Sequence, residues 1–406
     1  MKILCANGLF YPRSDANINC MMQILRELSR RGHEITVVTM TYDKSSTTYE
    51  EYDGFPIYRI YMPGSEFLFH FFEKWKPSSR IFSLAKVAMI HLLYALPKQI
   101  KYLKLLRIYQ KLRKDNHFDL VFSGLCPAES HSMAYAYARK THLPWVMYNM
   151  DSYAFNCGSP KNTKKRQRQE IRWCRAASGV VNSWGLSPFN RQCGYDPFGK
   201  LKQLEIPLPN LAIAPVPNDF QPHKKMELLY TGSFFADVRR PDELLRFLEK
   251  LDPDKFTASF YGFCCTYLRQ NYSHLPACVK LMGNVGLEEC KTLVQNADIL
   301  INVGNDCLNQ MPSKVFEYIG TGKPILNFFT REDEPAMFFL RMYPRILHVR
   351  NADDVAESDL YSIACSPALS KTELETIYQD ALQENVLCKF ADFLESFVTV
   401  EVNDDL

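Results

Sequence analysis

The chain has 406 residues, of which 47% are hydrophobic and 23% charged, and its net charge is +3. A chain of this length is too long for one ordinary core and favours two domains of about 200 residues each. The composition excludes a disordered protein, and so small a net charge gives no reason to expect binding to nucleic acid.

The first forty residues predict a strand, a helix and a second strand. An apolar run over 2–7 is typical of a buried strand, and apolar residues recur at helical spacing over 16–31. Gly32 is placed to end that helix, and the next strand is predicted over 34–40. This order implies a parallel sheet with a right-handed crossover.

The alternation of strands and helices continues until a proline-rich segment interrupts it. Before the interruption we predict strands over 56–61, 119–123, 144–149 and 179–183 and a helix over 129–140. Five prolines and few charges then lie between residues 206 and 223, which is typical of an interdomain linker. We therefore assign 1–205 to a first domain, 206–225 to a linker and 226–406 to a second domain.

The same alternation restarts after the linker. We predict strands over 227–231, 257–261, 279–282, 299–303 and 324–328, and helices over 241–250, 287–296 and 314–320. The stretch 374–398 predicts one or two terminal helices, the last of which can cross back to the first domain. We expect an α/β protein with two doubly wound, Rossmann-like domains that face a cleft, where the carboxyl ends of parallel strands bind ligands.

The cysteines and the apolar segments bear on the compartment. None of the thirteen cysteines forms a Cys-x-x-Cys pair, and Cys264 and Cys265 are adjacent, which suits neither zinc nor a redox dithiol. The apolar start of the chain is too short for a signal peptide, and the stretch 81–96 is too short and too polar to span a bilayer. We expect a cytoplasmic protein with reduced thiols.

The segment 297–326 has the pattern of a nucleotide-sugar site. It predicts a buried strand, a polar loop and a helix that Ser313 can cap, with Pro312 just ahead. The free amides of that terminus and the charge of Lys314 favour an anion, and Glu317 lies one turn further on, where it can accept hydrogen bonds from sugar hydroxyls. The alternative is that Lys314 and Glu317 form an ordinary surface ion pair.

A second candidate donor segment is 228–246. A strand ends at Gly232, where the backbone can approach a ligand closely, and Arg239 and Arg240 precede the next helix. Arginine matches phosphate geometry with paired donors, and a cation at a helix start favours an anionic partner over simple solvation. Asn284 follows another strand and is a candidate for the nucleobase pocket.

These segments resemble the donor-binding region of family-4 glycosyltransferases of the GT-B fold. The phrase Glu317–Pro324 is similar to the family's E-A-M-A-x-G-x-P, and Pro312-Ser313-Lys314 matches the P-S-K of a subset. The resemblance implies that Glu317 holds the ribose hydroxyls and that the amides near Ser313 and Lys314 meet the diphosphate. Asn309 stands where the family has a glutamate that touches the transferred sugar, and Ser233 stands where it has a basic residue.

The acceptor side of the cleft is less well marked. Asp15 and Ala16 stand where the family has Gly-Gly in its first loop. His131, at a predicted helix start, matches a family histidine that points into the cleft, and Asp151 matches an aspartate found in the P-S-K subset. An imidazole or a carboxylate can orient the acceptor or take its proton, and Glu129 is a rival for that role. A helix-terminal histidine without function is the alternative for His131.

The resemblance implies a retaining transfer from a UDP- or GDP-sugar to a glycan or lipid-linked acceptor in surface polysaccharide synthesis. The leaving diphosphate can itself take the acceptor proton, so stabilising that group by Arg239, Arg240 and Lys314 is the main requirement. The resemblance implies that no metal or other cofactor is needed. A sugar-nucleotide epimerase and a non-catalytic sugar-nucleotide-binding protein remain as alternatives.

Two basic segments predict contact with an anionic membrane surface. Lysines and arginines alternate with aromatic and aliphatic residues over 98–114, and a second basic run covers 161–175. Basic amphipathic helices of this kind are typical of peripheral membrane proteins. The alternative is a solvated helix face.

Overall fold

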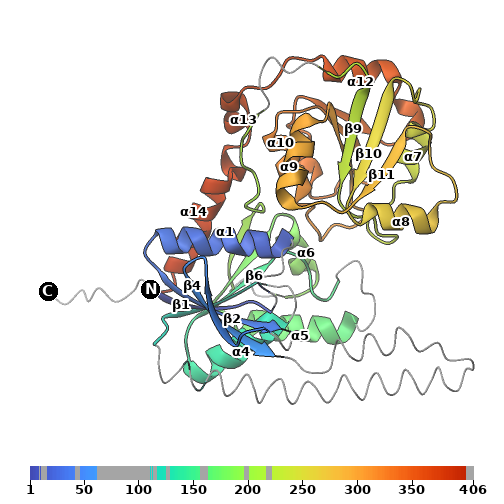
Figure 1. Cartoon of the computed structure of the whole chain (residues 1–406). Coiled ribbons are helices and arrows are strands. Elements are labelled where there is room, and N and C mark those ends of the chain that lie inside the picture. Colours follow the sequence, from blue (N-terminus) through green and yellow to red (C-terminus); the bar gives the residue numbers. More distant parts are fainter. Residues whose placement is uncertain are drawn as a thin grey trace, which may run out of the picture.

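The computed structural model describes residues 1–8, 10, 16–41, 46–61, 110, 112, 117–124, 129–155, 163–195, 201–215 and 222–398. Figure 1 shows two α/β domains, each built on one sheet with helices packed against it. The predicted fold class is thereby confirmed. Asp15, most of the basic segment 98–114 and the apolar stretch 81–96 lie outside the described residues.

The first sheet has eight strands in the order β3-β4-β2-β1-β5-β6-β7-β8. Every pairing is parallel except the β3–β4 hairpin. The strands are β1 (Lys2–Ala6), β2 (Glu34–Thr41), β3 (Tyr49–Tyr52), β4 (Phe55–Tyr61), β5 (Leu120–Gly124), β6 (Trp145–Asn149), β7 (Gly179–Ser183) and β8 (Lys202–Ile206). The central strands β5, β6 and β7 are buried along their whole length, which explains why they read as continuous apolar runs.

Four helices of the first domain are described: α1 (Ala16–Arg30), α4 (Glu129–Thr141), α5 (Thr163–Ala176) and α6 (Leu186–Gln192). The apolar stripe of α1, with Met21, Leu25 and Leu28, is buried as its helical spacing predicts. Gly32 has a φ of 84°, the left-handed conformation that ends a helix at low steric cost.

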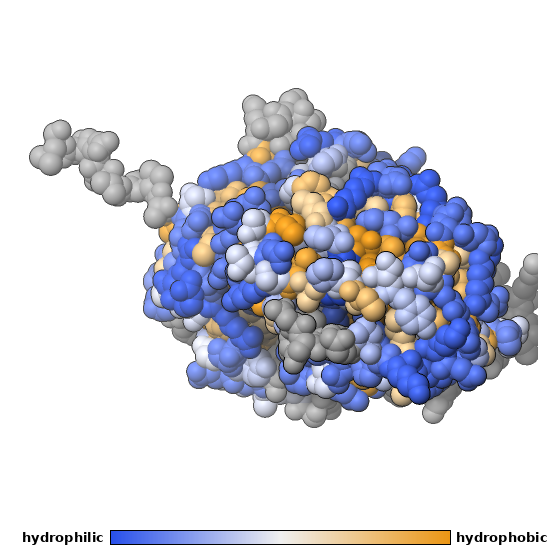
Figure 2. Space-filling model, turned by 90° about the horizontal axis from the view of Figure 1, so that it is seen from above, coloured by the Kyte–Doolittle hydropathy of each residue, from blue (hydrophilic) through white to orange (hydrophobic). Residues whose placement is uncertain are grey.

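The second sheet has six strands, all parallel, in the order β11-β10-β9-β12-β13-β14. Its strands are β9 (Met226–Thr231), β10 (Phe256–Tyr261), β11 (Val279–Gly283), β12 (Ile299–Val303), β13 (Ile325–Phe328) and β14 (Ile346–Val349). Its helices are α7 (Asp242–Leu248), α8 (Cys264–Asn271), α9 (Leu287–Asn296), α10 (Lys314–Gly320), α11 (Met337–Leu340), α12 (Glu357–Ala364) and α13 (Lys371–Ile377). On the face that Figure 2 shows, apolar residues lie in spots separated by hydrophilic ones.

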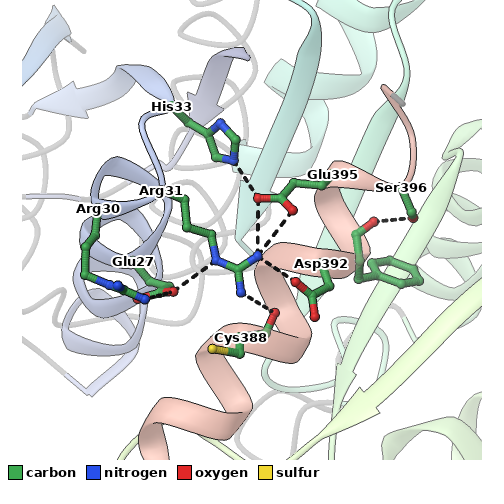
Figure 3. A network of polar contacts seen from close by, with 9 residues as sticks. Glu27, Arg30, Arg31, His33, Cys388, Asp392, Glu395 and Ser396 are labelled. Carbon is green, nitrogen blue, oxygen red and sulfur yellow. Dashed lines mark hydrogen bonds and ion pairs between the residues drawn. The ribbon is translucent and has the colours of Figure 1, made fainter. Parts of the chain in front are cut away.

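The last helix, α14 (Gln383–Glu395), returns to the first domain and packs beside α1 (Figure 1). The polar contact between the two helices is made by Arg31, directly after α1, whose guanidinium donates to Glu27, Asp392 and Glu395 (Figure 3). Phe397 packs on β7 at Gly179, where a Cβ would lie 2.3 Å from its ring. The predicted return of the terminal helix to the first domain is confirmed. The helices α1 and α14, which lie far apart in the sequence, therefore pack together in the first domain.

The described cysteines are free thiols, and most are buried. No helix in the described part of the chain is both long enough and apolar enough to span a bilayer.

Candidate functional site

The two domains meet at a cavity of about 620 Å³ whose wall includes Lys314 and Glu317, whereas the other predicted donor residues, among them Gly232, Arg239 and Asn309, do not line it. The first domain contributes the exposed face of α1, beginning at Ala16, and the second contributes α9 and α10. The wall combines charged and amide side chains, including Arg26, Lys291, Gln295, Lys314 and Glu317. A volume of this size is within the range of small-molecule sites, about 300–1,000 Å³.

Lys314 and Glu317 form an ion pair within this wall. The Lys314 ammonium donates to Glu317 Oε2 at 2.6 Å, and the two side chains are 28% and 38% exposed. Burial alone would lower the pKa of Lys314, but the Glu317 carboxylate, with smaller contributions from Tyr318 and Cys290, raises it above its ordinary value. The ion-pair alternative is therefore realised, but it faces the cleft and leaves a fixed cation and a carboxylate that ligand hydroxyls can reach.

The expected cap of α10 by Ser313 is wrong. Ser313 has helical dihedral angles, and its side chain makes no capping hydrogen bond. The helix turn therefore begins at or before Ser313, while Pro312 is buried just ahead of it. Ser313 therefore does not provide the capping oxygen that the sequence pattern suggested. Any contact between Ser313 and a phosphate would come from its backbone amide.

The helix α10 is joined directly to the glycine loop that follows β9. Tyr318 on α10 receives a hydrogen bond from the amide of Thr231 at 3.2 Å, and the two hydroxyls lie 3.0 Å apart. Gly232 comes next, and its carbonyl oxygen lies so close to Gly262 that a Cβ there would be only 2.6 Å away. Ser233 is half-buried, and its carbonyl accepts a hydrogen bond from Tyr230. The two predicted donor segments therefore lie side by side.

The two arginines of this loop already have partners. Arg239 donates two hydrogen bonds to Asn305 Oδ1, at 3.0 and 2.7 Å, which fixes it to the loop after β12. Arg240 is exposed and lies 3.9 Å from Asp242 and 3.8 Å from Asp306. The anionic partner expected at this helix start is thus present in the protein itself, and a ligand phosphate would have to compete with it.

Asn309, at the position of the expected sugar-binding glutamate, makes a contact between the domains. Its side chain is 5% exposed, and Nδ2 donates to the carbonyl oxygen of Phe155 at 2.7 Å. The next residue, Gln310, pairs with Asp151 in an antiparallel bridge. The polar loop after β12 therefore touches the first domain where the cleft is closed.

Replacing Asn309 by aspartate is expected to destabilise the protein by about 1–3 kcal/mol, because a carboxylate cannot donate and would face the Phe155 carbonyl while buried. Urea unfolding with matched m-values measures the change. Asn271→Asp is the control, since Nδ2 of Asn271 donates to the carbonyl of Tyr267 in the same way but on an exposed helix. Equal effects of the two substitutions would show that the buried interdomain bond contributes no more than the exposed one.

The orientation expected for His131 is wrong. It is 0% exposed, with Nδ1 2.8 Å from Ser123 Oγ and Nε2 3.0 Å from Asn149 Oδ1. Its ring packs edge-on to Trp145 and Trp173, and burial lowers its pKa to about 4. A neutral imidazole held inside the first domain organises β5 and β6 and does not reach a ligand in the cleft.

Solved structures show how far this architecture is shared, whereas no family model and no curated protein matches the sequence. Sucrose-phosphate synthase from Thermosynechococcus elongatus superposes with a TM-score of 0.67 at 13% identity, over 97% of this chain and 98% of that one. HepE from Anabaena, in complex with UDP, gives 0.62 at 15% identity over 98% and 100%. The lipopolysaccharide outer core galactosyltransferase WaaB gives 0.56 at 13% identity over 97% and 100%.

The chain has the GT-B fold. The remaining predicted residues belong to both domains of this fold. Ala16 is exposed at the start of α1, Glu129 is half-buried at the start of α4, and Asn284 is exposed directly after β11.

Asp151 is the acceptor-side residue whose chemistry is most unusual. It follows β6 and bridges to the second domain, and burial raises the pKa of its carboxyl to about 7. A group with this pKa exchanges protons near neutral pH, which general acid–base chemistry requires.

A second carboxyl group with a raised pKa, Glu334, was not among the predicted residues. It is 2% exposed, its Oε2 accepts a hydrogen bond from the amide of Asn305 at 2.6 Å, and burial raises its pKa to about 7. Oε1 has no hydrogen-bond partner among the described residues. Asn305 also accepts two hydrogen bonds from Arg239, so Glu334 helps to position the donor-side loop through Asn305. No signal of this burial is present in the sequence, because Glu334 stands in a charged run before a short helix.

Proposed function

We propose that this protein is a retaining glycosyltransferase that moves a sugar from a UDP- or GDP-sugar to a glycan or lipid-linked acceptor in surface polysaccharide synthesis. The observation that carries the proposal is the Lys314–Glu317 pair in the wall of the interdomain cavity of a GT-B fold. Structures of HepE hold UDP, UDP with glucose, and UDP-glucose, which supports a uridine nucleotide as the first donor to test.

The proposed roles follow from charge and position. Glu317 accepts hydrogen bonds from the ribose hydroxyls, and Lys314 and the amides beside it meet the diphosphate. Arg239 and Arg240 lie next to the same glycine loop and offset the charge that develops on the leaving group. The bond between the anomeric carbon and the diphosphate breaks, the acceptor oxygen bonds to that carbon on the same face, and its proton passes to the leaving diphosphate.

The proposed role of Asp151 is to orient the acceptor hydroxyl in its ionised form. Because its pKa is about 7, transfer should increase as pH rises through 7 and level off above 8. Asp151→Asn should lower the plateau and flatten this rise. The same change should raise stability above pH 7, because a carboxyl whose pKa is raised by folding loses stabilisation between the unfolded pKa near 4 and the folded value. An unchanged pH profile would remove Asp151 from the mechanism.

The proposed function is tested by titrating the protein with a panel of nucleotide-sugars and measuring binding and donor hydrolysis. Binding with slow hydrolysis, and transfer once an acceptor is added, supports a transferase. Interconversion of the donor sugar without an acceptor supports the epimerase, and binding without any turnover supports the non-catalytic protein. No binding to any nucleotide-sugar would sink all three.

We also propose peripheral contact with the inner face of a membrane from the cytoplasm. In the part of 161–175 that is described, α5 carries Arg166 over the ring of Tyr153 and Arg172 over the ring of Tyr135. Arg139 on α4 shares the Tyr135 ring. Cations held against aromatic rings at a surface suit anionic headgroups, and binding to phosphatidylglycerol vesicles but not phosphatidylcholine vesicles would support the proposal.

A further inference from the structure

A second cavity, of about 350 Å³, lies between the domains on the side of Leu308. The first domain contributes Trp184, directly after β7, and the second contributes Phe338 on α11. Leu308 adjoins Asn309, the position at which the resemblance places the transferred sugar. The cavity is therefore lined by the chain neighbour of the residue expected to touch the transferred sugar, and it shares no lining residue with the cavity of Lys314 and Glu317.

The two aromatic rings form a platform for a ligand with an apolar face. The centroids of Trp184 and Phe338 are 4.7 Å apart at an interplanar angle of 35°, and Phe338 is 51% exposed. Trp184 is partly buried beside it, so the apolar surface that the pair leaves for a ligand lies mainly on Phe338. Gly185, with a φ of 88°, lets the chain turn away at once, because a Cβ there would lie 2.8 Å from Pro335.

The rim of the cavity is polar, but its charges are already matched. The guanidinium of Arg341 is paired with Glu332, and Asp333 accepts from Arg331 at 2.8 Å. An anionic ligand would have to displace a carboxylate from Arg341, whereas hydroxyl groups can share these hydrogen bonds without displacing either partner. Glu334 also lines the cavity. It accepts a hydrogen bond from the amide of Asn305, whose side chain in turn accepts from Arg239 of the donor side.

We propose that this cavity binds one neutral sugar ring of the acceptor, with the ring's apolar face on Trp184 and Phe338. A volume near the lower limit of small-molecule sites accommodates a single ring. The inference rests on the proposed glycosyltransferase function and specifies the acceptor: its sugar next to the point of transfer is uncharged, and any phosphate of a lipid carrier lies outside this cavity.

The test compares Trp184→Ala and Phe338→Ala with wild type in transfer assays with methyl glycosides of neutral hexoses, N-acetylhexosamines and glucuronic acid. We expect the KM for neutral acceptors to rise about three- to tenfold in each variant, the loss expected for one aromatic contact, while the KM for the donor is unchanged. Tyr361→Ala is the control, since Tyr361, which is 40% exposed, lies on α12 at the far end of the second domain (Figure 1). Phe338 is the safer of the two positions because half of its side chain is exposed.

Several outcomes would overturn the assignment. An unchanged acceptor KM in both variants would do so, as would an equal rise in donor KM or a preference for glucuronic acid. Direct binding separates this failure from failure of the proposed function. The other described tryptophans, Trp145 and Trp173, are 1% exposed, so among the described tryptophans Trp184 is the one that a ligand can reach. If methyl glycosides quench the tryptophan fluorescence of wild type but not of Phe338→Ala, the cavity binds a sugar even in a protein that binds no nucleotide-sugar. Absence of such quenching together with absence of saturation-transfer signals would overturn it.

Discussion

Glu317→Ala is expected to weaken the binding of UDP or GDP about 10- to 100-fold. The carboxylate stands in the wall of the 620 Å³ cavity, and a hydrogen bond to a charged group typically contributes about 1.5–3 kcal/mol. The substitution also frees Lys314, whose ammonium would then be available to phosphate. The loss should therefore be largest for the nucleoside and smallest for inorganic diphosphate, and isothermal titration calorimetry with each ligand measures it.

A matched control for this prediction lies on α13. Lys371 and Glu375 form an ion pair at 3.5 Å with a four-residue spacing, and the Glu375 side chain is 40% exposed, close to the 38% of Glu317, but neither residue lines the cavity. Glu375→Ala should leave nucleotide binding unchanged. If Glu317→Ala also binds the nucleoside within twofold of wild type, Glu317 is only an ion-pair partner and the donor assignment fails.

The parts of the fold that the sequence predicted well are those set by local patterns. The bounds of α9, β12 and α10 agree with the expected ranges because each element has an apolar run or stripe of its own. The edge strands β3, β8 and β14 were missed. The strands β3 and β8 are only partly buried, so they lack the apolar run that marks a central strand. Pairing with a neighbouring strand defines such an edge strand more than its own residues do.

The site residues show the same distinction between local patterns and contacts with distant segments. The contact between Lys314 and Glu317 could be predicted, because their spacing on one helix turn brings the two side chains together. The error over His131 has another cause, since Trp145 and Trp173 bury it from strands and helices elsewhere in the chain. Arg239 was a donor-site candidate, but its hydrogen bond to Asn305, 66 residues away, could not be predicted from any local pattern. Burial and pairing of this kind arise only when distant segments meet.

The link between α1 and α14 gives the second large expected effect. Arg31→Ala should lower the free energy of unfolding by about 2–4 kcal/mol, because three carboxylates, those of Glu27, Asp392 and Glu395, would face one another without their shared cation (Figure 3). The Arg31 side chain is 21% exposed, so solvent would compensate only in part. Thermal and urea unfolding measure the change, and the neighbouring Arg30→Ala provides the control, since Arg30 is 70% exposed and its ion pair among the described residues is with Glu27 of α1. A small, equal effect of both substitutions would show that packing of α14, and not this cation, holds the terminal helix on the first domain. A selective effect of Arg31→Ala that also weakens nucleotide binding would show that the returning helix helps to set the spacing of the two walls on which Glu317 and Ala16 stand.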